Sequence, residues 1–149
     1  MAQLPNGSLA QIMRNCMPGT PNCQMLGGGG GGNRFLWSVS DDGGVTWAAP
    51  RPHADLVTPV CQGSLLGYKD ALYFAGPYST TQRHNLSVLR SDNNGQHFSR
   101  SLNLFAGNAG YTGLQCGLPG VQDCAVLFDG NGGTCNGICF VSFASGDVV

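Results

Sequence analysis

Short apolar runs separated by turn signals make up most of this chain. Residues 35–40 and 85–91 alternate between apolar and polar side chains, as a strand with one buried face does. Further apolar runs, bounded by Gly, Pro, Asn or Asp, cover residues 7–13, 64–69, 71–76, 125–130 and 138–144. No window has the apolar spacing of an amphipathic helix. The pattern therefore predicts an all-β protein of short strands joined by tight turns.

One turn motif follows both alternating runs. The stretch SVSDDGGVTW covers residues 38–47, and VLRSDNNGQHF repeats its pattern at residues 88–98. The shared positions are Ser40, Asp42, Gly44, Thr46 and Trp47 in the first copy, and Ser91, Asn93, Gly95, His97 and Phe98 in the second. Asp42 or Asn93 can accept hydrogen bonds from N–H groups two residues on, and the glycine can take a positive φ. An aspartate that is an asparagine in the other copy is a poor candidate for a catalytic proton donor. We therefore expect two structural turns, each with its corner packed by the following Trp47 or Phe98.

The spacing of the two copies indicates a β-propeller. They lie 51 residues apart, a period typical of propeller blades of several short strands. At that period 149 residues amount to about three blades, whereas closed propellers have four to eight. We expect one domain over residues 1–149, either part of a larger propeller or a fold that protects two open sheet edges. Residues 27–32, six consecutive glycines, are interpreted as a flexible loop between strands.

Composition and charge exclude several classes of function. The formal net charge is −1, so nothing favours binding to nucleic acid, and no apolar run is long enough for a transmembrane segment. Residues 1–15 lack the charged start and apolar core of a signal peptide. All eight acidic residues are aspartates, and the chain contains no glutamate. Nothing in the sequence calls for a cofactor.

The seven cysteines cannot all pair within one chain. They are Cys16, Cys23, Cys61, Cys116, Cys124, Cys135 and Cys139. The spacing of the last four permits local disulfides in an oxidising compartment, and buried free thiols are the alternative. Cys135 and Cys139 could also begin a zinc site, but no second Cys pair or His pair supports one, so we expect no metal. The cysteine content points to a secretory, lysosomal or extracellular location, while the compartment itself stays open.

The turn motif resembles the Asp-box of sialidases (neuraminidases), which also occurs in unrelated propellers. Further segments are similar to sialidase segments and follow the family's order: LPNGSLAQIMRN (4–15), TPVCQGSLLGY (58–68), TQRHNLSVLRS (81–91) and NAGYTGLQCGLPG (108–120). The resemblance covers nearly the whole chain. It implies a six-bladed sialidase-type propeller, of which this chain would be the C-terminal half, with about three blades of four-stranded antiparallel sheet. It also implies hydrolysis of terminal sialic acid from sialylated glycans with retention of configuration.

Carried over by position, the resemblance assigns four site residues. Arg14 and Arg83 would be two of three arginines that clamp the carboxylate of the sugar, and Tyr111 would be the nucleophile. Asp129 would orient an arginine. A planar guanidinium matches a carboxylate with two hydrogen bonds, and a neutral phenol avoids the repulsion that an anionic nucleophile would meet there. Without the motifs, the arginines could equally be surface charges and Tyr111 a corner-packing aromatic.

The pattern departs from the family at the other half of the site. The glutamate that activates the tyrosine in sialidases would fall before Met1, and the acid/base aspartate and first arginine belong to the family's N-terminal blades. The expected function is therefore that of a sialidase fragment, inactive by itself. The alternatives are a non-catalytic module that binds sialic acid or glycans, and a structural or interaction propeller. Open sheet edges would also allow self-association.

Overall fold

Ten antiparallel strands form two sheets in the part of the chain that the computed structural model describes, residues 1–15, 33–120 and 122–149. The strands are β1 (Ala2–Gln3), β2 (Leu9–Met13), β3 (Arg34–Ser40), β4 (Arg51–Val57), β5 (Ser64–Tyr68), β6 (Ala71–Pro77), β7 (His84–Ser91), β8 (Arg100–Cys116), β9 (Cys124–Gly132) and β10 (Cys135–Phe143). A short 3₁₀ turn, η1 (Ser145–Asp147), follows β10. The prediction of an all-β, antiparallel protein is confirmed. Within these residues no helix is long and apolar enough to cross a membrane.

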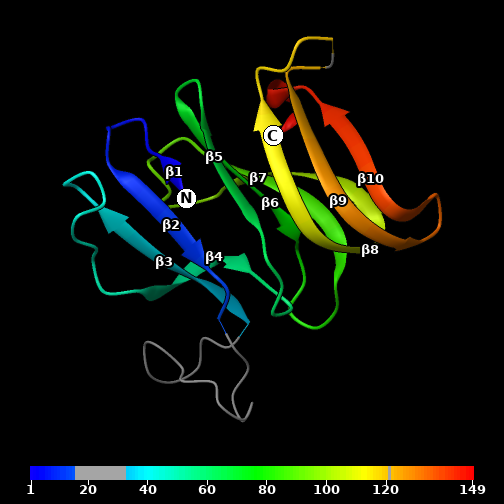
Figure 1. Cartoon of the computed structure of the whole chain (residues 1–149), viewed down its shortest axis with the longest axis horizontal. Helices are drawn as coiled ribbons and strands as arrows, with labels where there is room; N and C mark the ends of the chain where they lie inside the picture. The colour runs from blue at the N-terminus through cyan, green and yellow to red at the C-terminus, as the bar shows by residue number, and fades with distance from the viewer. Residues whose placement is uncertain (16–32, 121) are drawn as a thin grey trace.

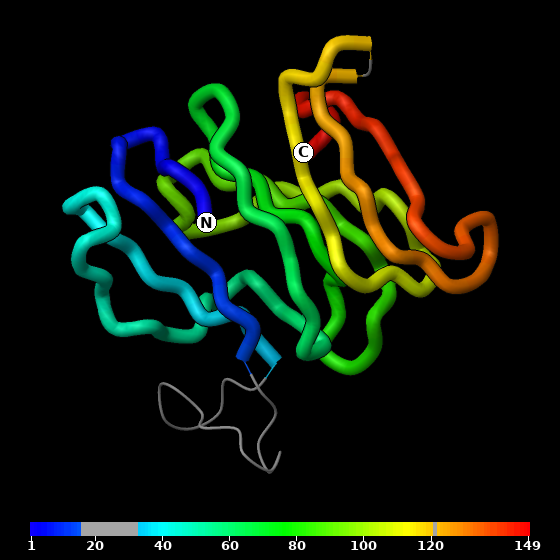
Figure 2. The backbone as a smooth tube through the Cα atoms, in the orientation of Figure 1, coloured from blue at the N-terminus to red at the C-terminus, as the bar shows by residue number. Residues whose placement is uncertain are grey.

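The strands fall into three groups that stand side by side (Figures 1 and 2). The first group is the sheet β1-β2-β3-β4, and the second is β5, β6, β7 and the first half of β8. The second half of β8 pairs with β9, and β9 pairs with β10, which forms the third group. Because β8 runs without a break from the second group into the third, these two groups share one six-stranded sheet. In the described residues the third group has three strands, where the sequence predicted four.

Two apolar cores separate the three groups. Phe35 and Trp37 of β3 pack with Leu72, Phe74 and Leu89 between the first and second groups. On the other face of the second group, a separate core joins β6 and β7 to the third group; it includes Tyr73, Val88, Leu114, Val126 and Phe128. Strand β6 is buried at all seven positions because alternate side chains enter the two cores. Burial of these apolar side chains is the main force that holds the groups together.

The two turn motifs have matching hydrogen bonds. Asp42 Oδ1 accepts from the backbone N–H of Thr46 at 2.9 Å, and Asn93 Oδ1 accepts from that of His97 at 2.9 Å. These donors are four residues on, and not two as the sequence suggested, because the N–H groups two residues on, those of Gly44 and Gly95, donate to the hydroxyls of Ser40 and Ser91 instead. Gly44 and Gly95 take the positive φ expected of them, 94° and 74°. The Asp42 carboxylate accepts three hydrogen bonds from Thr46 and one from Ser40. These bonds lower the pKa of Asp42 to about 2, and the bond from the Thr46 hydroxyl is the largest cause.

The aromatic residues that end the two turns differ in burial. Phe98 is buried in the core between the first and second groups, with its ring 6.4 Å from that of Trp37. Trp47 is only partly buried, and its indole N–H donates to the carbonyl oxygen of Gly44 at 3.1 Å. Corner packing into a core therefore holds for Phe98, while Trp47 packs on its own turn.

Four of the cysteines form two local disulfides, Cys116–Cys124 and Cys135–Cys139, as the spacing allowed. The second of these uses both sulfur atoms that a zinc site would have needed. Cys61 is buried and free. Cys16, Cys23 and the glycine run 27–32 lie outside the described residues.

Candidate functional site

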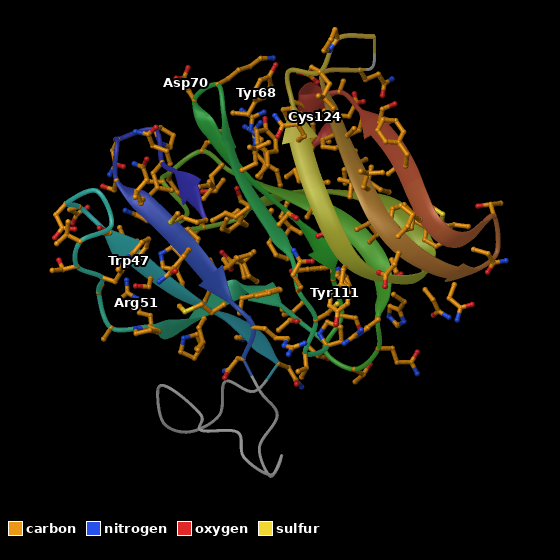
Figure 3. The ribbon with its side chains drawn as sticks, in the orientation of Figure 1. Trp47, Arg51, Tyr68, Asp70, Tyr111 and Cys124 are labelled. Carbon is orange, nitrogen blue, oxygen red and sulfur yellow. A yellow bond between two sulfur atoms is a disulfide. The ribbon has the colours of Figure 1, made fainter. Side chains whose placement is uncertain are left out.

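Arg83 and Tyr111 lie together at one end of the molecule. Arg83 directly precedes β7, and its carbonyl oxygen accepts a hydrogen bond from the N–H of Ala109 on β8 at 2.8 Å. Its guanidinium carbon lies 5.2 Å from the centroid of the Tyr111 ring. Tyr111 is 49% exposed and lies at the opposite end of the molecule from Tyr68, Asp70 and Cys124 (Figure 3). Arg83 and Tyr111 thus lie on one surface because β7 pairs with β8.

A strained turn supplies a further contact to Arg83. Val60 has a φ of 59°, in the left-handed region that a β-branched residue rarely adopts. Its carbonyl oxygen accepts a long hydrogen bond, 3.5 Å, from Nη2 of Arg83. The same turn is closed by Thr58, whose hydroxyl accepts from the N–H of Cys61 at 2.9 Å. The segment before β5 therefore contributes to holding the guanidinium beside the Tyr111 ring.

Asp129 approaches the backbone next to Tyr111. A Cβ atom at Gly110 would collide with Oδ1 of Asp129, so a side chain at this point requires the carboxylate of Asp129 to move. Oδ1 is buried and has no hydrogen-bond partner among the described residues. Asp129 and Arg83 line one cavity of about 510 Å³. Its other lining residues are Gln82, Asn108, Ala109, Gly110, Gly130 and Asn131.

Arg14 follows the end of β2 and is exposed. Strand β2 ends at the same side of the view as Tyr111 (Figures 1 and 3). Burial raises the pKa of the Cys61 thiol, the positive charges of Arg83 and Arg14 lower it, and the carboxylate of Asp129 raises it. Arg14, Arg83 and Asp129 therefore all lie close enough to the buried sulfur atom of Cys61 to influence it electrostatically. The hydrogen bond and the ring contact described above both belong to Arg83.

The segment around Gln62 meets the strand that carries Tyr111. Oε1 of Gln62 accepts from the N–H of Thr112 at 2.8 Å, and Nε2 donates to the carbonyl oxygen of Thr112 at 3.0 Å. The hydroxyl of Ser64 donates to that same oxygen at 2.6 Å. The resemblance to sialidase motifs includes this segment but assigns no role to Gln62 or Ser64.

The turn-motif residues lie apart from this cavity. Ser40 to Trp47 connect β3 to β4, and Ser91 to Phe98 connect β7 to β8. None of them lines the cavity of Arg83 and Asp129. In the described ranges no three His, Cys, Asp or Glu side chains are grouped closely enough to hold a metal ion.

Comparison with known proteins identifies the architecture. A Hadza microbial sialidase superposes with a TM-score of 0.72 at 22% identity, over 99% of this chain and 27% of its own. A leech intramolecular trans-sialidase gives 0.70 at 17% identity, covering 99% and 23%, and the intramolecular trans-sialidase of Ruminococcus gnavus gives 0.70 at 16%, covering 99% and 32%. The chain has the sialidase fold. No family model matches it, and no curated protein matches it.

The chain spans about a quarter to a third of the length of these sialidases. The three strand groups of this chain therefore correspond to a part of the sialidase architecture, and they include the region where Arg83 and Tyr111 meet. At these identities the likeness establishes the fold.

Proposed function

We propose that this chain carries part of a sialidase-type site for the terminal sialic acid of glycans. Arg83 and Arg14 hold the carboxylate of the sugar, and Tyr111 is the nucleophile of a retaining hydrolysis. The observation that carries the proposal is the guanidinium of Arg83 at 5.2 Å from the Tyr111 ring, within the sialidase fold. The two solved trans-sialidases provide chemical support, because one is a complex with 2,7-anhydro-Neu5Ac and the other a complex with oseltamivir carboxylate.

The proposed reaction has two displacements. The phenol oxygen of Tyr111 gives up its proton to a base and forms a bond to the anomeric carbon, while the glycosidic oxygen leaves with a proton from an acid. Water then attacks the anomeric carbon from the side the leaving group vacated and gives a proton to the group that acted as the acid. The bond to Tyr111 breaks, and the phenol oxygen takes its proton back from the base. Two inversions give net retention. Arg83 serves both steps by fixing the carboxylate that is attached to the reacting carbon.

Asp129 has a supporting role in this proposal. A buried carboxylate oxygen without a hydrogen-bond donor is costly, and a guanidinium would satisfy it. We assign Asp129 to orienting an arginine of the clamp, as a carboxylate does when it fixes a planar fork in one direction.

Binding of the sugar and its hydrolysis place different demands on the chain. The 149 residues contain no glutamate, so the sialidase-type base for Tyr111 is not supplied by this sequence. The acid/base aspartate and the first arginine of the clamp likewise have no counterpart that we can assign here. We therefore propose that this chain alone binds sialic acid weakly and does not hydrolyse sialosides. The absence of glutamate also favours the second candidate, a non-catalytic module that binds sialic acid or glycans.

One pair of measurements tests the proposal. Release of fluorophore from a fluorogenic sialoside should be indistinguishable from the rate without protein. In an NMR titration, N-acetylneuraminic acid should bind with a dissociation constant on the order of millimolar, and galactose, which has no carboxylate, should not bind. Clear turnover would show that another residue acts as the base. Equal binding of both sugars would refute the carboxylate clamp.

A further inference from the structure

The strand that carries Tyr111 is irregular at that residue. The register of β8 against β9 shifts between Ala109 and Thr112, and neither Gly110 nor Tyr111 has a partner on β9. On its other edge, β8 pairs with β7 only as far as Asn108, opposite His84. The backbone around Tyr111 therefore lacks the regular hydrogen bonds that fix the direction of a side chain on a strand.

The side chain of Gln62 takes the place of a neighbouring strand at this point. Its amide presents one acceptor and one donor, as a peptide group does, and bonds both the N–H and the C=O of Thr112. The Thr112 N–H belongs to the peptide group that joins Tyr111 to Thr112. Fixing that peptide plane limits the ψ angle of Tyr111, and hence the orientation of the residue on the strand.

The remaining contacts act on other groups. The Thr112 hydroxyl donates to the Ala75 carbonyl oxygen at 2.9 Å, which anchors the Thr112 side chain and not the peptide group after Tyr111. The Ala109 N–H is bound to the carbonyl of Arg83, but that bond is two residues before Tyr111. The close approach of Asp129 at Gly110 limits the position of the backbone without a hydrogen bond to it. Ser64 bonds the Thr112 carbonyl, which belongs to the next peptide group. The bond from Thr112 N–H to Gln62 Oε1 acts directly on the peptide group after Tyr111.

We propose that Gln62 is a positioning residue that directs the Tyr111 ring toward Arg83. The orientation of the Tyr111 ring toward Arg83 is a matter of geometry alone. The importance of this orientation for catalysis rests on the proposed function. A consequence is that the segment 58–64 serves the site twice, through the Val60 carbonyl on Arg83 and through the Gln62 amide beside Tyr111. Both partners of the contact would then be set from one short segment before β5.

An NMR experiment on the whole chain tests the inference. The Tyr111 ring lies close enough to Arg83 to shift the side-chain resonances of the arginine through its ring current. Tyr111→Leu gives the resonance position without the ring, and Arg83→Lys assigns the signal. In Gln62→Met, which keeps the length of the side chain but no hydrogen bond, the Arg83 signals should move most of the way to their position in Tyr111→Leu. Gln122→Met is the matched control, because Gln122 is exposed like Gln62 but lies in the turn between β8 and β9, and it should leave them unchanged.

Sialic-acid binding gives a separate readout. Gln62→Met should weaken it about fivefold, the effect of one hydrogen bond of ordinary net strength. If the Arg83 signals move but no form of the protein binds sialic acid, the inference stands and the proposed function fails. If the thermal midpoint falls while the Arg83 signals of the folded protein stay in place, Gln62 has a structural role only and the inference is wrong.

A second variant covers the case in which Gln62→Met does not fold. Gln62→Glu keeps the acceptor for the Thr112 N–H and loses the donor to the Thr112 carbonyl. Since the bond to the N–H is the one that orients Tyr111, this variant should keep the Arg83 signals near their wild-type positions. Loss of the ring-current shift in Gln62→Glu, or failure of both variants to fold, would overturn the inference.

Discussion

The guanidinium carbon of Arg83 lies 5.2 Å from the centre of the Tyr111 ring, although the two residues are 28 positions apart in the chain. The pairing of β7 with β8 brings them together, since the carbonyl of Arg83 bonds the N–H of Ala109. A cation beside a phenol ring suits a ligand that carries both a carboxylate and an electrophilic carbon.

The shape of the guanidinium should matter as much as its charge. Arg83→Ala should weaken binding of N-acetylneuraminic acid about tenfold, the typical loss for hydrogen bonds to a charged group. Arg83→Lys should recover less than half of this free energy, because an ammonium lacks the planar fork that matches a carboxylate. Arg51→Ala is the control, since Arg51 is an exposed arginine that does not line the cavity of Arg83 and Asp129. NMR titration measures all three, and full recovery by lysine would contradict a bidentate clamp.

A side chain at Gly110 should displace the carboxylate of Asp129 and lower the stability. In Gly110→Ala the new Cβ would meet Oδ1 of Asp129 at 2.3 Å, so we expect a loss of about 1–3 kcal/mol in the free energy of unfolding. Gly113→Ala on the same strand is the matched control, because nothing lies within 4 Å of its added Cβ. Urea denaturation measures both. Adding Asp129→Ala to Gly110→Ala should restore part of the loss, and equal stability of the two single variants would refute the close contact.

Asp42 should act as a hydrogen-bond acceptor and not as an acid. Asp42→Asn should fold nearly as stably as the wild type, since Asn93 makes the corresponding bond in the second turn, whereas Asp42→Ala should be clearly less stable. The pKa of Asp42 is lowered to about 2, so its contribution to stability is present above pH 3.8 and lost as the pH falls toward 2. Denaturation at several pH values tests this, and Asp42→Asn should flatten the curve in that window.

His53 should make the interface of the first and second groups sensitive to acid. Its Nε2 lies 2.7 Å from the Gly95 carbonyl oxygen, and its Nδ1 accepts from the N–H of Asp55 at 3.1 Å, which fixes the neutral ring between Trp37 and Phe98. Burial is the largest cause that lowers the pKa of His53 below 6.5. The ionisable groups that act on it are Asp55, His97 and Arg34.

The sign of the effect follows from this pKa. The unfolded chain binds a proton at His53 more readily than the folded one, so stability is full above pH 6.5 and declines as the pH falls below it. Thermal midpoints between about pH 7 and 5 should therefore decrease in the wild type and change less in His53→Gln. His84→Gln, a histidine outside this interface, should keep the wild-type slope. An unchanged slope in His53→Gln would rule out this source of acid sensitivity.

The outer face of the third group should promote self-association. Leu127, Ile138 and Phe140 are 52%, 77% and 53% exposed, and Leu127 pairs directly with Phe140 across β9 and β10. Exposed apolar side chains that lie next to one another favour association. Sedimentation velocity should show less oligomer for Leu127→Ser with Phe140→Ser than for the wild type. Val45→Ser, which removes an exposed apolar residue in a turn, should have no effect. Equal oligomer content in all three proteins would contradict the prediction.

The strands and the turn motifs could be predicted because their determinants are local. Ser40, Asp42 and Thr46 bond within one turn, so their spacing alone indicates the geometry. Burial was harder to predict. The sequence does not distinguish Trp47, which is partly buried, from Phe98, which is buried, because the difference depends on the sheet that packs against each.

The sequence by itself determined the all-β class, the repeat of about fifty residues, and a short list of residues through their resemblance to sialidase motifs. Only the tertiary structure decided which of them meet. The Arg83–Tyr111 contact depends on the register of β7 and β8, and the Gln62–Thr112 bonds join residues 50 positions apart at an irregularity of β8. Strand register and bulges arise from the packing of whole sheets against two cores, and no short stretch of sequence contains that information.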